Sequence, residues 1–331
     1  GLQRAECDAA LSAGVNMILE PATMRGNAVA GFTSVRGRSH TFDARADGYA
    51  RGEAVDAVAS RCADDAPSRV WMVGSAIRQD GRSASLTAPN GQAQQGVLSA
   101  SLADACLEVG EVAVLEAHGT GTALGDPIEA GAVAAVYRSS EGGLVVGSLK
   151  ANAGHTEPGA GLAGALKLCV QLCGRGMSPN AQLRVVNPHV GAALCGMLSC
   201  RLPAQVGPLA TLDCESMNGG VSSFGYAGTI AHALLHTPDS TLPAAATGAT
   251  CSIIWKRSAF AWRLYPMTSR VASRAKLVPK GFHAVACACM PLQTAHSSRD
   301  LVLAHTTTSI DCCLCTPHPI DLRASPRASL V

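Results

Sequence analysis

Two histidines stand in short turns that are rich in glycine and threonine and that follow apolar runs. His118 lies in the run EAHGTGT at 116–122, and His155 lies in the run KANAGHTEPG at 150–159. Each apolar run predicts a strand, which puts each histidine at the carboxyl end of a strand, where open α/β sheets place their sites. Two neutral imidazoles that donate N–H groups to one oxygen stabilise an enolate, as an oxyanion hole does.

Charged residues near the two turns are candidates to support the imidazoles. Lys150 precedes His155 by five residues and can bias the local charge or hold neighbouring acids. The acids Asp126, Glu129 and Glu157 are expected to fix the imidazole tautomers or to pair with this lysine.

A third glycine-rich run, NGGVSSFGYAGTIAH, spans 218–232. One interpretation is a tight connection between two strands, which needs small residues. The other is a functional turn, with a backbone N–H donor near Tyr226 and with the rings of Phe224 and Tyr226 gating a pocket. The sequence alone leaves both open.

Two other kinds of site are less favoured by the spacing. The glycines at 119, 121 and 125 follow a predicted strand but read G-x-G-x-x-x-G, and no acidic residue closes a later strand as in a dinucleotide site. Six of the fourteen cysteines lie between 251 and 315, near His283 and His318, without the C-x2-C pairs of a zinc ribbon. We therefore predict neither a nucleotide nor a metal site.

Composition limits the class of protein. Of 331 residues, 47% are hydrophobic and 15% are charged, and 34 are glycine, which favours a packed α/β enzyme body over a disordered or coiled-coil chain. The net charge of +2, with scattered lysines and arginines, argues against nucleic-acid binding. No apolar run is long enough to span a membrane, and no signal peptide is recognisable. We expect a cytoplasmic protein.

The apolar periodicity predicts alternating strands and helices between 68 and about 238, and hence a largely parallel sheet covered by helices. The expected elements are a helix at 5–13, a strand at 16–19, a long loop through 42–53, strands at 69–74, 112–115 and 144–147, and helices at 96–109, 127–137 and 158–172. An aromatic segment at 255–262 could pack back on the body. Residues 267–331 show no sustained period, so we expect a poorly ordered tail.

The segments at 116–130, 148–167 and 220–235 resemble the histidine, lysine–histidine and glycine-rich motifs of the β-ketoacyl synthases. The likeness is strongest to the ketosynthase domains of modular type I polyketide synthases, and 42–53 and 78–91 extend it. The resemblance covers about residues 1–238, and 259–263 resembles the segment that follows such domains.

The resemblance implies a thiolase-like fold, layered α-β-α-β-α, that is incomplete in its N-terminal half. It implies the end of the N-terminal ketosynthase half at 1–67, the C-terminal half at 68–238, and a linker with a disordered tail at 239–331. The implied reaction is a decarboxylative Claisen condensation of acyl and malonyl thioesters, in polyketide or fatty-acid synthesis. No cofactor is implied, since the phosphopantetheine of an acyl carrier protein carries the substrates. A homodimer is possible.

The family's roles carry over to single residues. By resemblance His118 and His155 are the two catalytic histidines, Lys150 is the family's lysine, and Tyr226 is the gating aromatic whose N–H helps to form the oxyanion hole. Ile230 stands where asparagine is usual, and Ala227 replaces a glycine, which would be strained at a positive φ. Residues 54–62, AVDAVASRC, match the expected apolar strand poorly.

The family's nucleophilic cysteine lies in a DTACSS-like turn upstream of the segment that resembles residues 1–14. We therefore expect no nucleophile in its usual place in this sequence and no acyl transfer by the chain as given. Two hypotheses stay open: part of a condensing ketosynthase, or a catalytically incompetent fragment that acts at most as a carrier-protein-binding module.

Overall fold

A six-stranded sheet forms the centre of the structure, which is a computed structural model. It describes residues 2, 6–62, 69–83, 88–140, 143–209 and 216–238, and the backbone of two strands at 253–260 and 282–289. The strands of the sheet lie in the order β3 (Trp71–Gln79), β10 (Thr229–Thr237), β9 (Met217–Phe224), β4 (Val112–Glu116), β5 (Leu144–Gly147) and β7 (Cys200–Arg201).

The sheet is mixed, which corrects the expectation of a largely parallel one. Strand β4 runs parallel to β5 and β9, and β5 runs parallel to β7, whereas β10 is antiparallel to β3 and β9. Only the four residues 225–228 connect β9 to β10. A connection this short joins antiparallel strands, because a parallel pair needs a crossover of a dozen residues or more.

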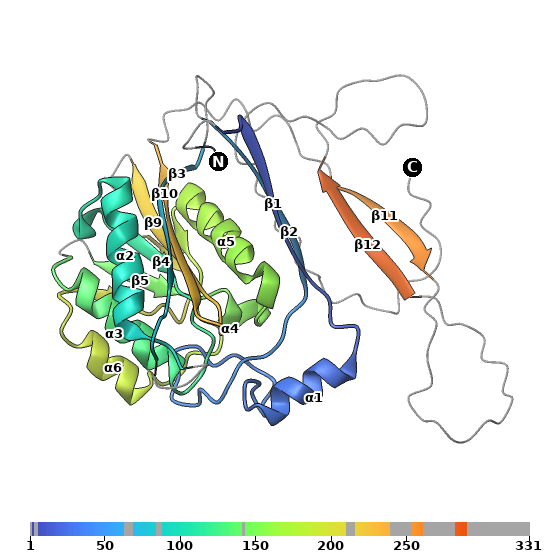
Figure 1. Ribbon diagram of the computed structural model, residues 1–331, viewed down its shortest axis with the longest axis horizontal. Coiled ribbons are helices and arrows are strands. Elements are labelled where there is room, and N and C mark those ends of the chain that lie inside the picture. Colours follow the sequence, from blue (N-terminus) through green and yellow to red (C-terminus); the bar gives the residue numbers. More distant parts are fainter. Residues whose placement is uncertain are drawn as a thin grey trace, which may run out of the picture. The chain divides into compact units, whose positions relative to one another are not determined.

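Helices cover both faces of the sheet (Figure 1). On one face α2 (Gly91–Ala105) contacts β3 and β10 and packs against α3 (Gly125–Tyr137), which in turn contacts α6 (Pro188–Leu194). On the other face α5 (Ala160–Gly174) contacts β9 and β4. Each face buries its own apolar cluster, with Leu115 and Tyr137 in one and Leu168 and Leu172 in the other.

Glycines allow α5 to lie close to the sheet. A Cβ at Gly164 of α5 would lie 3.2 Å from Cγ of Glu116 on β4, and one at Gly219 of β9 would lie 2.8 Å from Cδ1 of Leu168. Larger residues at these two positions would push the helix away. The close approach brings a charged side chain of α5 next to the end of β4.

The expected elements of this part are present, with shifted ends. The helix predicted at 96–109 begins earlier, because the side-chain oxygen of Asn90 caps α2 by accepting the N–H groups of Gln92 and Ala93 at 3.0 and 3.2 Å. It ends before Cys106, whose φ of 53° stops the helix. Short elements complete the body: η2 (Val109–Glu111), α4 (Lys150–Ala153), η3 (Glu157–Gly159), β6 (Gly176–Met177) and β8 (Gly207–Pro208).

The N-terminal predictions were wrong. Instead of a helix at 5–13 and a strand at 16–19, the chain forms β1 (Ala9–Asn16), which pairs antiparallel with β2 (Ala54–Arg61) over eight residues. Helix α1 (Pro21–Val29), which begins with a proline, was missed. Cross-strand pairing decides the conformation of this alanine-rich segment against its helix propensity. Residues 54–61 form a strand although their pattern is poorly apolar.

The two-stranded sheet forms a further layer. Both β1 and β2 contact α5 on the side away from the six-stranded sheet (Figure 1). Gly14 of β1 packs under the backbone of Gly159, where a Cβ would lie 2.7 Å from the Gly159 Cα. The order of layers is thus helices, six-stranded sheet, α5 and two-stranded sheet.

The expectations for the C-terminal part fall largely outside the described residues. Two strands are described there, β11 (Ile253–Phe260) and β12 (Phe282–Cys289), which pair antiparallel and belong to a second compact unit at 243–307. They lie within segments for which the sequence predicted no such pairing. The predicted domain boundaries at 67/68 and 238/239 include residues outside the described ranges.

We expect Leu234→Ala to lower the free energy of unfolding by about 2–5 kcal/mol, because this β10 side chain is fully buried and its truncation leaves a cavity. Leu198→Ala is the matched control, since Leu198 is 69% exposed and its loss should change stability by less than about 0.5 kcal/mol. Urea unfolding followed by circular dichroism measures both. Equal losses in the two variants would contradict the described core.

Candidate active site

The two histidine turns meet at one edge of the six-stranded sheet. Strand β4 ends at Glu116 and β5 ends at Gly147, and their parallel pairing puts the two carboxyl ends side by side. The rings of His118 and His155 lie 5.7 Å apart between centroids, at an interplanar angle of 87°. The structure thus brings together the two side chains that the sequence singled out.

A backbone N–H group fixes the tautomer of His118. The N–H of Phe224 donates to Nδ1 of His118 at 3.2 Å, so Nδ1 is unprotonated and Nε2 carries the proton. Burial lowers the pKa of His118 well below 6.5, and the nearby positive charge of Lys150 lowers it further. His118 is therefore a neutral imidazole with its N–H at Nε2.

His155 is held in the same way. The N–H of Glu157 donates to Nδ1 of His155 at 3.0 Å. Burial lowers the pKa of His155 from 6.5 to about 3, with smaller contributions from Lys150 and Arg51. Its ring and the ring of Tyr49 pack in a T-shaped arrangement, with centroids 4.8 Å apart. The second imidazole is also neutral and also carries its proton at Nε2.

Both Nε2–H groups remain available to a ligand. No described residue makes a hydrogen bond to Nε2 of His118 or of His155, whereas both Nδ1 atoms are occupied. Two N–H donors of neutral imidazoles can then serve one oxygen that gains negative charge. The sequence suggested that Asp126, Glu129 and Glu157 fix the imidazole tautomers or pair with Lys150. In the structure backbone N–H groups, not carboxylates, contact both Nδ1 atoms.

Two of the expected carboxylates instead hold the backbone of the His118 turn. Glu129 accepts the N–H groups of His118 and of the following glycine at 2.7 and 2.8 Å. Asp126 accepts those of Phe42 and Gly121 at 2.8 and 3.0 Å. Burial raises the pKa of both acids, that of Asp126 to about 6. They fix the turn and join it to the loop at 42–53.

Among the described residues, Lys167 rather than Lys150 forms an ion pair with an acid. Nζ of Lys167 lies 2.6 Å from Oε2 of Glu116, and both side chains are buried. The other oxygen of Glu116 accepts the N–H of Leu149 at 2.5 Å. Lys150 is buried at the start of α4, where burial lowers its pKa and the charges of Glu116 and Glu129 oppose that shift. Glu116 thereby ties together β4, α5 and the turn that carries Lys150.

The two aromatic residues of the third run lie differently. The Phe224 ring contacts the His118 ring, with centroids 5.5 Å apart. Tyr226 is 77% exposed, and its ring lies 6.3 Å from that of Phe32. Phe224 is therefore part of the histidine site, and the gating role of Tyr226 stays a prediction.

The structure accommodates Ala227 and Ile230, the two residues of the third glycine-rich run that differ from the family's usual ones. The positive φ of the β9–β10 turn falls on Gly228, at 95°, and Ala227 does not adopt one, so the strain considered for Ala227 is absent. Ile230 is fully buried in β10. An apolar side chain fits this position.

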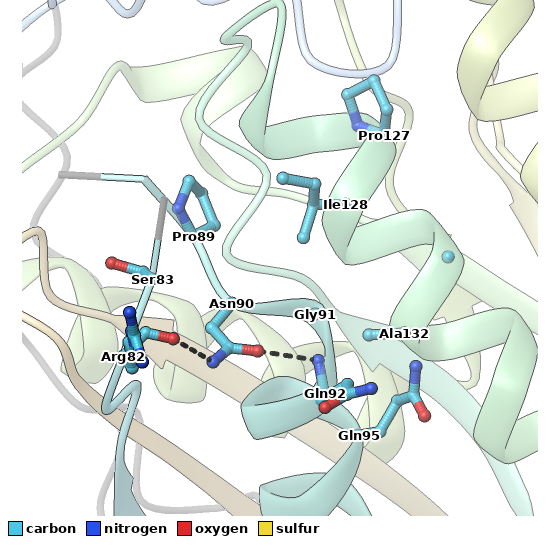
Figure 2. A pocket seen from close by; sticks show the side chains of 11 residues that line it. Arg82, Ser83, Pro89, Asn90, Gly91, Gln92, Gln95, Pro127, Ile128 and Ala132 are labelled. Carbon is cyan, nitrogen blue, oxygen red and sulfur yellow. Dashed lines mark hydrogen bonds between the residues drawn. The ribbon is translucent and has the colours of Figure 1, made fainter. Parts of the chain in front are cut away.

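A groove between the starts of α2 and α3 is separate from the histidines (Figure 2). Asn90, Gln95 and Ile128 are among its lining residues. The Asn90 side chain donates to the carbonyl of Arg82 at 3.3 Å and accepts from the N–H of Gln92 at 3.0 Å. Its amide thus serves the cap of α2, and the groove adds nothing to the site.

The described residues contain neither a metal-ligand cluster nor a helix that could span a membrane. In this part of the chain no group of three or more His, Cys, Asp and Glu side chains could hold a metal ion. The cysteines and histidines between 251 and 318 lie outside the described side chains. No helix within the described ranges is long and apolar enough to cross a membrane.

Sequence reasoning missed four residues around the site. Glu116 and Lys167 form the buried ion pair, and Tyr49 and Arg51 lie against the His155 turn. A signal was present, because a charge inside an apolar strand and another inside an apolar helix call for a buried partner. Pairing them across fifty residues of sequence required the fold.

Two family models match the chain. The model of the β-ketoacyl synthase C-terminal domain matches residues 70–184, and that of the β-ketoacyl synthase N-terminal domain matches residues 1–59. Among curated proteins, a phenolphthiocerol/phthiocerol polyketide synthase of Mycobacterium tuberculosis is 40% identical over 259 residues, which are 75% of this chain and 13% of that protein. Highly reducing polyketide synthase gloL of Glarea lozoyensis is 34% identical over 244 residues, which are 72% and 9%.

Solved ketosynthase structures share the fold. The ketosynthase from module 6 of the bacillaene synthase of Bacillus subtilis 168 has a TM-score of 0.67 and 30% identity, over 71% of this chain and 43% of that one. The oxazolomycin ketosynthase domain OzmH KS7 of Streptomyces albus JA3453 has a TM-score of 0.67 and 27% identity, over 79% and 46%. The expected thiolase-like fold is confirmed. The chain spans less than half the length of these structures and about a tenth of the curated relatives.

Lys167→Met should lower the free energy of unfolding by about 3–5 kcal/mol, because it leaves the Glu116 carboxylate buried without its partner. The double variant Lys167→Met, Glu116→Gln should recover most of the loss, since glutamine is neutral and can still accept the N–H of Leu149. Urea unfolding of the single and double variants measures the difference. Additive losses would show that the two side chains do not interact.

The depressed pKa of His155 predicts a pH dependence of stability. His155 binds a proton near pH 6.5 in the unfolded chain but only near pH 3 in the folded chain. The contribution of neutral His155 to the free energy of unfolding is therefore complete above pH 6.5 and is lost as the pH falls toward 3. Between pH 7.5 and 5, the chain should lose about 1–2 kcal/mol more than the His155→Gln variant does. The control His189→Gln, at an exposed position, should keep the full loss. An unchanged loss in His155→Gln would contradict a neutral His155.

Proposed function

This chain belongs to the β-ketoacyl synthase family, and on that premise we propose that His118 and His155 hold the enolate of a malonyl thioester in a decarboxylative condensation. The observation that carries the proposal is the pair of neutral imidazoles, 5.7 Å apart, whose Nδ1 atoms both accept backbone N–H groups. The Nε2–H groups are left for the substrate oxygen.

In the proposed reaction decarboxylation comes first and leaves the bonding electron pair on the substrate. The bond between the malonyl carboxylate and the α-carbon breaks, carbon dioxide leaves, and the electron pair becomes an enolate whose charge lies on the thioester oxygen. Each imidazole N–H donates to that oxygen, and a donor of this kind stabilises the transition state by about 2–4 kcal/mol. The α-carbon then attacks an acyl thioester, and the acyl carbonyl carbon releases its thiolate.

Neutral imidazoles suit this task better than charged ones. A neutral Nε2–H donor stabilises a developing oxyanion without transferring a proton to the enolate carbon, which would end the reaction as simple decarboxylation. Burial and the nearby Lys150 hold both histidines neutral. The positive charge of Lys150 near the two imidazoles favours this neutral state.

The partners and the acyl-accepting residue belong to the proposal as well. We assign the malonyl and acyl groups to the phosphopantetheine arm of an acyl carrier protein, and the acyl acceptor to a cysteine upstream in the family's pattern. The curated relatives are polyketide synthases, which favours polyketide synthesis for the product. A homodimer and a cytoplasmic location stay predictions. A binding module without catalysis is less favoured, because the histidine geometry is fully formed.

Malonyl decarboxylation tests the function without the acyl step. The chain is incubated with malonyl pantetheine, and acetyl pantetheine is measured by mass spectrometry. We expect decarboxylation above the protein-free rate, and a fall of about 10²–10³-fold in His118→Ala and in His155→Ala, as when an oxyanion donor is lost. His189→Ala, at an exposed position, should keep the rate. A wild-type rate equal to the protein-free rate, or unchanged rates in both site variants, would contradict the proposed function.

A further inference from the structure

Glu157 has an unusual backbone conformation at a point that matters for His155. Its φ is +43°, a left-handed value that few residues other than glycine adopt. In this conformation its N–H donates to Nδ1 of His155, two residues earlier, at 3.0 Å. The tautomer of His155 therefore depends on a strained residue, and the strain must be offset by other contacts.

An arginine from a distant loop supplies those contacts. Nε and Nη2 of Arg51 lie 2.8 Å from Oε1 and Oε2 of Glu157, which is a bidentate ion pair. The Arg51 side chain is only 5% exposed. Tyr49 and Asn27 add longer hydrogen bonds, of 3.5 Å each, to Oε1 of Glu157. Three residues thus contact the Glu157 carboxylate.

The loop of Arg51 is in turn aligned with His155. The N–H of His155 donates to the carbonyl of Ala50 at 2.7 Å, and the N–H of Gly52 donates to the carbonyl of His155 at 2.8 Å. Gly52 must be small, because a Cβ there would lie 2.6 Å from the carbonyl oxygen of Ala153. The two backbone hydrogen bonds flank Arg51 and fix where its side chain begins.

We propose that Arg51 is a positioning residue for the enolate-holding site. Its ion pair with Glu157 holds Glu157 in the left-handed conformation, the Glu157 N–H is thereby aimed at Nδ1 of His155, and the proton of His155 is confined to Nε2. The inference rests on the proposed function for its meaning, but the contacts that carry it do not involve a substrate.

A purely structural role for Arg51 predicts different behaviour of the variants. If Arg51 only joined the loop at 42–53 to the His155 turn, any contact of similar strength would replace it. If it acts through the backbone of Glu157, then a residue that adopts a positive φ without strain makes it dispensable. Glycine is that residue, because it has no Cβ and keeps its N–H.

The test is the tautomer of His155 in the whole chain at pH 7.5. The chain carries ¹⁵N-histidine, the His155 signals are assigned with His155→Asn, and exchange of the Glu157 amide is followed alongside. Arg51→Gln should give His155 a measurable Nδ1–H population and speed Glu157 amide exchange by about tenfold or more, the factor for a lost hydrogen bond. Glu157→Gly, and Glu157→Gly with Arg51→Gln, should both keep the single Nε2–H form.

Controls separate the inference from general damage to the loop. Arg36→Gln removes an exposed ion pair of the same loop, with Asp47, and should leave His155 unchanged. Arg51→Lys is the milder variant if Arg51→Gln does not fold, because lysine keeps the charge but cannot form the bidentate pair. It should shift His155 in the same direction.

Three results would overturn the inference. They are an Nδ1–H form of His155 in the unaltered chain, a single Nε2–H form retained in both Arg51 variants, and a dependence on Arg51 that persists in the Glu157→Gly background. Malonyl decarboxylation is measured separately on the same samples. A chain that fails to decarboxylate while His155 responds to Arg51 as expected contradicts the proposed function and supports the positioning role.

Discussion

The buried Glu116 carboxylate is the interaction on which the site depends. One oxygen pairs with Lys167 of α5, and the other accepts the N–H of Leu149. Glu116 ends β4, two residues before His118, and Leu149 lies directly before the helix that leads to His155. Glu116 thus links the two histidine turns, which the parallel pairing of β4 and β5 already places side by side. A buried ion pair is expensive to desolvate, so its value here lies in geometry more than in net stability.

Around this ion pair, different chemical groups have different roles. Backbone N–H groups set the tautomers of both imidazoles, and carboxylates hold the backbone. Burial, helped by Lys150, keeps the imidazoles neutral. A carboxylate at Nδ1 would raise the pKa of an imidazole and favour its charged form. A backbone donor instead fixes the tautomer without adding negative charge.

Elements marked by a local sequence pattern were predicted, whereas features that depend on contacts between distant segments were missed. Strands β4 and β5 are short apolar runs, and Pro127 in the first turn of α3 marks the start of that helix, so these elements were predicted well. Residues 5–13 read as a helix because alanine favours one, but pairing with β2 makes residues 9–13 part of strand β1. The histidines were found from turn composition. The role of Arg51 could not be, because it follows from the φ of a residue 106 positions away.

The central claim is that two neutral imidazoles serve one oxygen. A crystal structure of the chain with a malonyl-thioester analogue that cannot lose carbon dioxide tests it most directly. The account predicts the thioester carbonyl oxygen at about 2.7–3.1 Å from Nε2 of both His118 and His155. A carbonyl oxygen bound by Lys150, or by only one imidazole while the other donates elsewhere, would contradict it.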